Sequence, residues 1–277
     1  MRNRRSIKPR HVVITGAGSG IGRETALAFA QLGAEVVVSD VNGAAAQQTA
    51  QTISERGSRA HAYPLDVSDR AAVEAHAEEV AESHGIPDVV INNAGIGQAG
   101  SFVETSPEDF ERVMNINFYG VVNGCRAFGA KMVARGTGGH IVNVSSMAAY
   151  VPQQSFSAYS TSKAAVFMFS DCLRAEFAHA GIKVSTICPG IVHTNIVATT
   201  HFSGLSDQAE KERQQKFDQL YRRRHYTPDR VAERIVHAVQ TGKAIVPVTP
   251  EAHVAYHLRR LVPALGRWAA ARKDIIG

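Results

Sequence analysis

The sequence predicts an α/β fold in which a doubly wound, mainly parallel sheet of seven strands carries helices on both faces. Short apolar runs alternate with longer amphipathic stretches, the pattern of buried parallel strands joined by covering helices. The 277 residues are 44% hydrophobic and 20% charged, which is typical of a globular chain with a sizeable core. A glycine-rich segment directly follows the first apolar run, at the edge where such sheets bind ligands.

The apolar runs are the predicted strands, and the amphipathic patterns between them are the predicted helices. We expect strands at Val12–Thr15, Glu35–Asp40, Ala60–Leu65, Val89–Asn92, His140–Val144, Lys183–Cys188 and Ala244–Val248. The expected helices include Ile21–Leu32, Gly43–Glu55, Ala71–His84, Pro107–Ala134 and Ser157–Ala180. Residues 193–228 are charged and irregular, and a gap of that length in a compact domain indicates a functional lid or a disordered loop.

Charge divides the chain into a basic arm at residues 1–10, a main domain at 11–248 and an extension at 249–277. The formal charge is +5, and the arm alone holds five basic residues and no acidic one. The remaining 25 basic residues balance the 25 acidic ones, so a nucleic-acid partner is not expected for the body. The arm is expected to be a flexible, solubilising tail, with contact to acidic lipid or nucleic acid as the alternative.

The cysteines and the apolar runs indicate a cytoplasmic protein. Cys125, Cys172 and Cys188 are odd in number and widely spaced, so they form no disulfide framework and favour a reducing compartment. No apolar run approaches the roughly 18 residues that span a bilayer. The basic N-terminal residues are not followed by an apolar stretch, so a secretory signal is not expected.

A glycine-rich loop follows the strand Val12–Thr15. Glycines at alternate positions let the backbone turn sharply and approach a ligand closely. The helix that begins there offers free N–H groups and the positive end of its dipole to a pyrophosphate. The spacing is T-G-x-x-x-G-x-G rather than the strict G-x-G-x-x-G, yet its place between strand and helix still predicts a dinucleotide site. The residues expected to hold the dinucleotide are Gly16, Ser19, Gly20, Ile21 and Gly22.

Asp40 ends the second strand and favours NAD over NADP. Its carboxylate can accept hydrogen bonds from both hydroxyls of the adenosine ribose, and its charge would repel a 2′-phosphate. None of the neighbouring residues Ser19, Ser39 and Val41 is a cation that could hold that phosphate. A solvated aspartate at the strand end is the alternative interpretation.

Tyr159 and Lys163 are four residues apart in a helical pattern, so they share one face. A free tyrosine has a pKa near ~10, and a nearby ammonium would lower it toward neutrality. Ser146 lies just past the strand His140–Val144, where its hydroxyl can hydrogen-bond a substrate oxygen. Downstream of a glycine loop, this trio predicts proton transfer to or from an alcohol or carbonyl.

Over residues 10 to 248, these motifs resemble the classical short-chain dehydrogenase/reductase family, whose fold is the Rossmann fold. Asn92-Asn93-Ala94-Gly95 fits the family's N-N-A-G motif, and Asn117 matches its catalytic asparagine. Ser146 is preferred over Ser145 because the family places the serine thirteen residues before the tyrosine. The resemblance adds as cofactor-binding residues Asp66, Val67, Asn93, Ala94, Gly95, Tyr159, Lys163, Pro189, Gly190, Val192 and Thr194.

The resemblance also implies a mechanism and an assembly. Tyr159 would be the general acid/base, Lys163 would lower the tyrosine pKa and bind the nicotinamide ribose, and Ser146 would orient the substrate oxygen. Asn117 would hold a water that links Lys163 to solvent. Homo-oligomers, usually tetramers, would form through the helices that carry Asn117 and Tyr159, with a dimer as the alternative.

Apolar residues near the lid suggest a hydrophobic substrate, such as a secondary alcohol or its ketone. Their alternative role is core packing, and His193 is more simply a loop residue than a substrate contact. The expected substrate residues are Ser146, Met147, Tyr150, Phe156, Tyr159 and Ile196, with Val151, Val197 and Phe202 nearby. The charged segment from Lys211, which ends in Arg222–Arg224, is expected to be a lid helix, with an anion site as the alternative.

The C-terminal extension carries apolar residues at helical spacing beside basic ones, and Pro263 should divide its helix. This stripe can pack on the body or on a second subunit, which we favour, or lie on a membrane surface. His253 and His257 are four residues apart without a third ligand, so no metal site is expected there. No metal ligands are expected elsewhere in the chain either. The sequence thus predicts an NAD-dependent alcohol–carbonyl oxidoreductase; the alternatives are an NADP-dependent carbonyl reductase and a non-catalytic dinucleotide sensor.

Overall fold

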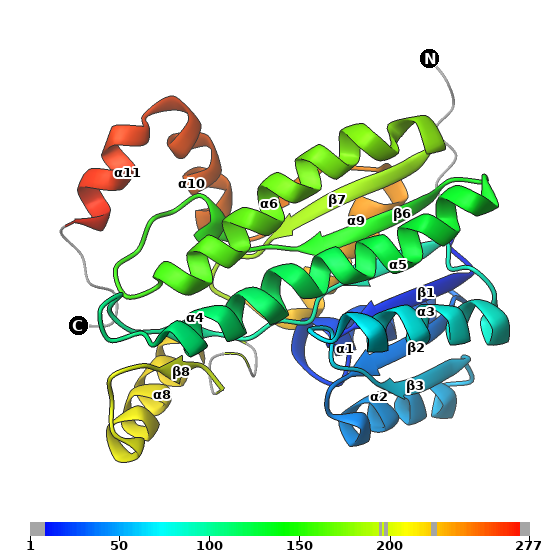
Figure 1. Cartoon of the computed structure of the whole chain (residues 1–277), viewed down its shortest axis with the longest axis horizontal. Coiled ribbons are helices and arrows are strands. Elements are labelled where there is room, and N and C mark those ends of the chain that lie inside the picture. Colours follow the sequence, from blue (N-terminus) through cyan, green and yellow to red (C-terminus); the bar gives the residue numbers. More distant parts are fainter. Residues whose placement is uncertain (1–8, 194–195, 197–198, 223–225, 272–277) are drawn as a thin grey trace.

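A computed structural model of the chain describes residues 9–193, 196, 199–222 and 226–271. It contains a seven-stranded sheet in which every pairing is parallel, between two layers of helices (Figure 1). The strands are β1 (His11–Thr15), β2 (Glu35–Asp40), β3 (Ala60–Pro64), β4 (Val89–Asn92), β6 (Gly139–Val144), β7 (Ile182–Cys188) and β9 (Ile245–Pro247). Their order is β3-β2-β1-β4-β6-β7-β9, so the winding reverses between β1 and β4. The predicted doubly wound Rossmann fold is confirmed.

Alternate residues of each strand serve the two layers. In β1, Val12 and Ile14 belong to one buried cluster and Val13 to the other. The first cluster is completed by α1 (Gly20–Gln31), α2 (Gly43–Glu55) and α9 (Pro228–Thr241), and the second by α3 (Arg70–His84), α5 (Gly120–Arg135) and α6 (Ser157–Phe177). In Figure 1, α5 and α6 cross the near face of the sheet while α9 lies behind it.

The helix expected at Pro107–Ala134 is divided into two. The helix α4 (Pro107–Met114) begins where Ser106 accepts a hydrogen bond from the Asp109 amide, and a π-helical turn, η1 (Asn115–Tyr119), joins it to α5. All of this segment is helical. The apolar pattern therefore predicted the bounds of the helical region but not the π-helical turn inside it. Turns of this kind are frequent at functional sites.

The predicted lid region contains the helix expected from the charged segment at Lys211 and also a short strand that the sequence did not indicate. A two-residue strand β8 (His201–Phe202) pairs in parallel with β5 (Gln98–Ala99), about a hundred residues earlier in the chain. The helix α8 (Asp207–Arg222) follows and projects from the body below β8 (Figure 1). Strands this short leave no alternation to read, which explains why they were missed.

Pro263 divides the C-terminal extension as expected, because α10 (Pro250–Leu261) ends just before it and α11 (Pro263–Ala270) starts with it. Val254, Leu261 and Trp268 on these helices are exposed. Across the described ranges, no helix is both long enough and apolar enough to cross a membrane. Most of the basic arm, at residues 1–8, lies outside the described residues, as do Arg223 and Arg224.

Candidate active site

A cavity of about 670 Å³ opens at the carboxyl ends of the central strands, beside the reversal between β1 and β4. Ligands bind at this position in open α/β sheets. The predicted residues that line it are Gly16, Ser19, Gly20, Ile21, Asp40, Asp66, Val67, Asn93, Ala94, Gly95, Ser146, Met147, Phe156, Tyr159, Lys163, Pro189, Gly190, Val192 and Ile196.

The glycine loop is held against the N-N-A-G segment. The Asn93 side-chain amide donates to the carbonyls of Thr15 and Gly16, both at 3.0 Å. Gly16 has a φ of +63°, and a Cβ there would lie 2.7 Å from the Ala94 Cα. Gly22 does not line the cavity; a Cβ on it would lie 2.1 Å from the Gly16 carbonyl oxygen. Gly22 therefore allows α1 to start close under the loop.

The other end of the loop is tied to Asp40. One carboxylate oxygen accepts from the Gly18 amide at 2.9 Å and the other from the Asn42 amide at 2.9 Å. These bonds fix the carboxylate at the cavity wall. Ser19, the residue before α1, makes no side-chain capping hydrogen bond. The start of α1 thus faces the cavity without a capping group, as a pyrophosphate site requires.

Asn117 lies in the π-helical turn and is fully buried. Its Oδ1 accepts from the Ile96 amide at 2.8 Å, and its Nδ2 donates to the Ile96 carbonyl at 3.0 Å and to the Ser162 hydroxyl at 3.1 Å. Asn117 does not itself line the cavity, but a Cβ on Gly95 would meet its Oδ1 at 3.1 Å and the Lys163 Nζ at 3.2 Å. Asn117 and Lys163 therefore flank the same glycine behind the cavity wall.

Ser146, Tyr159 and Lys163 meet at the end of β6. Ser146 precedes the short 3₁₀ helix η2 (Met147–Ala149), and Tyr159 and Lys163 lie one turn apart on α6. Lys163 is 3% exposed, its Nζ donates to the Val144 carbonyl at 3.2 Å, and it lies 5.8 Å from the centroid of the Tyr159 ring. The three side chains form one proton-handling group.

Burial perturbs both titratable members of this group. It raises the pKa of Tyr159, and a hydrogen bond with Ser146 partly opposes that rise. Burial lowers the pKa of Lys163 to about 8. The ammonium is thus largely retained at neutral pH, close enough to the tyrosine to favour its phenolate.

Some predicted residues lie elsewhere. Tyr150 does not line the cavity; its hydroxyl donates to the Ala252 carbonyl of α10 at 3.0 Å, and its ring packs on Tyr256. Val151 and Phe202 are likewise absent from the lining, and Phe202 is buried in a small cluster with Phe156. Thr194 and Val197 lie outside the described residues.

The cavity wall also holds residues that the sequence analysis did not single out. Three of them, Gln98, Thr199 and Thr200, belong to the β5–β8 region, and Arg112 comes from α4. No local motif marks Gln98, Thr199 and Thr200, because segments about a hundred residues apart meet where β5 pairs with β8. The other lining residues that were not predicted as site residues come from several elements: Val41, Leu65, Ile96, Gly97, Ile116, Val144, Ser145, Ala148, Gln153 and Ile191.

Comparison with curated proteins finds oxidoreductases. The chain is 59% identical over 267 residues to the Probable oxidoreductase EphD of Mycobacterium tuberculosis, a match that covers 96% of the chain and 45% of EphD. It is 36% identical over 261 residues to the Putative oxidoreductase SadH of the same species, covering 93% of the chain and 92% of SadH. The chain thus spans about half the length of EphD and nearly the whole of SadH.

A solved structure and a family model agree with these matches. A short-chain dehydrogenase/reductase from Burkholderia phymatum, solved in complex with NAD, superposes with a TM-score of 0.85 at 28% identity, covering 92% of this chain and 94% of that one. The family model described as short chain dehydrogenase matches residues 10–202. The chain therefore belongs to the short-chain dehydrogenase family.

Proposed function

We propose that the protein is an NAD-dependent oxidoreductase that interconverts a hydrophobic secondary alcohol and its ketone. The observation that carries this proposal is the grouping of Ser146, Tyr159 and Lys163 on one wall of a cavity whose other end holds Asp40. A proton-transfer group and a ribose-binding carboxylate in one cavity are what hydride transfer to or from a dinucleotide needs.

Tyr159 exchanges the proton of the reacting oxygen, and Ser146 hydrogen-bonds that oxygen so that it faces the phenol. The hydrogen bond with Ser146 partly offsets the penalty that burial places on the phenolate, and we assign the ammonium of Lys163, 5.8 Å from the ring centroid, the same electrostatic role. NAD, when bound, accepts or donates the hydride at its nicotinamide ring. A positioned acid/base of this kind contributes on the order of 10²–10⁴ in rate.

The proposed proton relay past Asn117 has to use an oxygen of this residue. Both N–H groups of the side-chain amide are already donated, one to the Ile96 carbonyl and one to the Ser162 hydroxyl. A relay water between Lys163 and solvent can therefore find no donor on this side chain. We place it where it can donate to an Asn117 oxygen, either Oδ1, which accepts a single amide hydrogen bond, or the main-chain carbonyl.

Asp40 supports NAD as the cofactor. Each of its oxygens accepts a single amide hydrogen bond, which leaves lone pairs for ribose hydroxyls. The loop residue Ser19 and the flanking Val41, both in the cavity wall, are not cations that could hold a 2′-phosphate. The Burkholderia phymatum structure in complex with NAD is consistent with this choice. NADP remains the alternative, and separate NADH and NADPH titrations decide between them.

The substrate end of the cavity is the region around Met147, Phe156 and Ile196. These apolar side chains support a hydrophobic substrate, while Gln153 and Thr200 offer polar contacts at its rim. The test is a screen of hydrophobic secondary alcohols with NAD and of ketones with NADH, followed by NADH absorbance. Turnover that Tyr159→Phe abolishes supports the proposal. Cofactor binding without turnover of any such compound would favour the sensor alternative.

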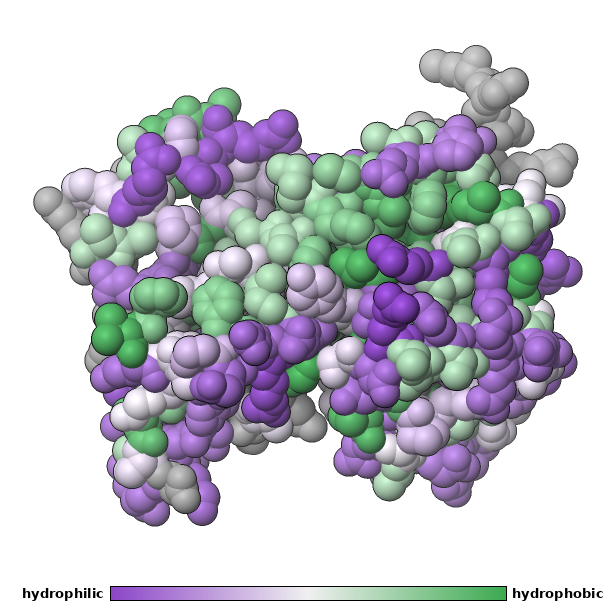
Figure 2. Space-filling model, in the orientation of Figure 1, coloured by the Kyte–Doolittle hydropathy of each residue, from purple (hydrophilic) through white to green (hydrophobic). Residues whose placement is uncertain are grey.

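We further propose that the protein acts as a homo-oligomer, a dimer or tetramer, built on the face of α5 and α6. An apolar band crosses this face in Figure 2. Tyr119 at the end of η1, Val133 on α5 and Met168 on α6 are 51%, 40% and 62% exposed. An apolar surface of this kind is typical of a protein–protein contact when it is contiguous. Cys125, Cys172 and Cys188 are free thiols, which supports a reducing, cytoplasmic location.

A further inference from the structure

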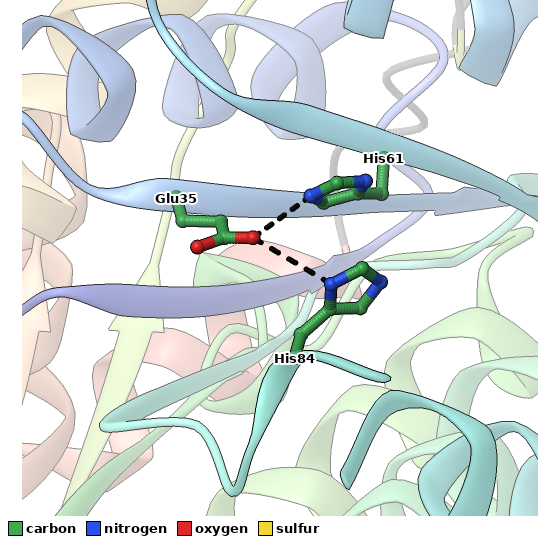
Figure 3. Close-up of side chains that lie close together, drawn as sticks. All are labelled: Glu35, His61 and His84. Atoms are coloured by element: carbon green, nitrogen blue, oxygen red, sulfur yellow. Dashed lines mark hydrogen bonds and ion pairs between the residues drawn. The ribbon is translucent and has the colours of Figure 1, made fainter. Parts of the chain in front are cut away.

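Glu35, His61 and His84 converge at the amino-terminal edge of the sheet, opposite the cofactor cavity. Glu35 is the first residue of β2, His61 the second of β3 and His84 the last of α3. Figure 3 shows both imidazoles directed at the same carboxylate oxygen of Glu35. His61 Nε2 lies 2.8 Å from that oxygen and His84 Nδ1 lies 3.5 Å from it.

From this convergence we propose that Glu35, His61 and His84 bind a divalent transition-metal ion, and the ion that we favour is Zn²⁺. The three donor atoms all lie within 4.8 Å of one another. Ligands about 2.0–2.1 Å from a tetrahedral Zn²⁺ sit roughly 3.4 Å apart. The imidazoles of His61 and His84 are stacked, with ring centroids 3.9 Å apart, so zinc binding requires the two rings to turn apart until both nitrogens point at the ion. Two nitrogens and one carboxylate oxygen form a common zinc donor set, with water as the fourth ligand.

The surroundings of His84 support this assignment. Its second ring nitrogen, Nε2, lies 2.9 Å from the Tyr63 hydroxyl. Metal-binding histidines nearly always use the second nitrogen in such a bond, which fixes the ring. Because His84 is also the last residue of α3, the negative end of the helix dipole favours a cation there.

Access and local charge also fit a cation. The His61 side chain is 35% exposed, against 17% for Glu35 and 11% for His84, so the cluster is open on the His61 side. Negative charge lies near the cluster: Glu79 partly opposes the lowering of the His84 pKa by burial, and Asp88 partly opposes that of the neighbouring His11. Arg59 is the opposing charge: it pairs with the other oxygen of Glu35, at 3.1 Å, and its side chain is 79% exposed. It can stay there or swing into solvent while the shared oxygen binds the ion.

This site deviates from the expectation that the protein carries no metal ligands. Its three residues lie 26 and 23 positions apart in the sequence, so they form no short metal-binding motif. The ion would join β2, β3 and the end of α3 at the edge of the sheet that does not carry the catalytic residues. We therefore assign it a stabilising role that is separate from catalysis.

Zinc titration of the chelator-treated full-length chain tests the proposal. The background is Cys172→Ser, because that exposed thiol would compete for zinc. We expect one equivalent of Zn²⁺ by calorimetry and a rise in melting temperature, with no effect of Mg²⁺. Glu35→Gln and His84→Asn should each weaken zinc affinity more than 100-fold. Tyr63→Phe keeps all three ligands and should weaken it about 10- to 100-fold.

The matched control is His179→Asn, an exposed histidine outside the cluster, which should bind zinc like the background. Imidazole ¹⁵N spectra of the background protein avoid the question of whether a variant folds. Zinc should shift His61 Nε2 and His84 Nδ1. Absence of a stoichiometric site, undiminished affinity in Glu35→Gln or His84→Asn, or unshifted His61 and His84 nitrogens would each overturn the proposal.

Discussion

The ammonium of Lys163 lies 5.8 Å from the centroid of the Tyr159 ring and is anchored by a hydrogen bond to the Val144 carbonyl. The anchor comes from the end of β6, the strand that also leads into Ser146. One strand end thus positions both Ser146, to which we assign the reacting oxygen, and Lys163, to which we assign support of the Tyr159 phenolate. A movement of this strand end would therefore displace Ser146 and Lys163 relative to Tyr159.

Tyr159→Phe should lower turnover by about 10²- to 10⁴-fold, because it removes the proton donor and acceptor while leaving the ring in place. NADH affinity should stay near its original value. Tyr150→Phe is the matched control: it removes only the hydroxyl that donates to the Ala252 carbonyl. That variant should keep its turnover and lose about 1 kcal/mol of unfolding free energy. A comparable loss of turnover in both variants would contradict our placement of Tyr150 outside the site.

Lys163→Met should raise the unfolding free energy of the cofactor-free protein at pH 7 while it abolishes turnover. Burial lowers the pKa of Lys163 from 10.5 to about 8, so the unfolded chain binds its proton more tightly. This difference costs the folded state about 3 kcal/mol below pH 8, partly offset by the bond to Val144, and the cost fades as pH rises toward 10.5.

Urea unfolding of this variant at pH 7 and pH 9.5 measures that effect. The gain over the original protein should shrink at the higher pH. Lys183→Met, which replaces an exposed lysine on β7, is the control and should show no gain at pH 7. A gain of equal size at both pH values would contradict the explanation by charge burial.

His76 and His140 should make the protein sensitive to acid. Burial lowers the pKa of each to about 4, and each pairs with a serine hydroxyl, Ser39 and Ser185 respectively. Between pH 6.5 and 4 the unfolded chain binds protons that the folded chain excludes, so stability falls as pH is lowered through this window. Each histidine accounts for up to about 3 kcal/mol of that fall.

The measurement is the unfolding free energy of His76→Gln and His140→Gln between pH 7 and pH 4.5. Both variants should have a lower unfolding free energy at pH 7 and a flatter pH dependence. His179→Gln, at an exposed position, should follow the original curve. An unchanged slope in both buried-site variants would show that other groups control the acid response.

Asp40→Ser should weaken NADH binding and narrow the preference over NADPH. The substitution removes the ribose acceptor and the charge that repels a 2′-phosphate. It also removes the acceptor of the Gly18 amide, so Asp40→Asn is the companion variant that keeps an oxygen there. Fluorescence titrations of both variants with both cofactors measure the change. Unaltered discrimination in the two variants would place cofactor selection elsewhere in the cavity.

Met168→Glu should dissociate the proposed oligomer, because it replaces an exposed apolar side chain of α6 with a charge on the proposed interface. Sedimentation velocity measures the mass, and circular dichroism checks that the fold is kept. Leu32→Glu is the control. Leu32 is similarly exposed, at 51%, but it is the C-cap of α1, which belongs to the helix layer on the other face of the sheet from α5 and α6. A monomeric original protein, or an assembly unaffected by Met168→Glu, would contradict the proposed interface.

The sequence was most informative where local chemistry decides structure. The bounds of β2 and α2 were predicted to the residue, because Asp40 and the cap Asn42 end one element and start the next. The spacing of Ser146, Tyr159 and Lys163 likewise predicted that these three residues lie together. The sequence failed where distant segments meet: β5 pairs with β8, and Tyr150 turns toward α10 instead of the cavity. Neither contact has a signal in the local sequence pattern, since both depend on how the lid and the C-terminal extension pack on the main domain.

The π-helical turn at Asn115–Tyr119 separates two helices with different packing demands. Phe128 of α5 is buried in the core against the sheet, whereas Asp109 of α4 accepts a hydrogen bond from Ser203 beside β8. One residue corresponds to about 100° of helical phase. Deleting a single residue here would keep the polypeptide helical yet turn Asp109 away from Ser203, so the length of this segment, more than its composition, keeps the lid in register with the catalytic body.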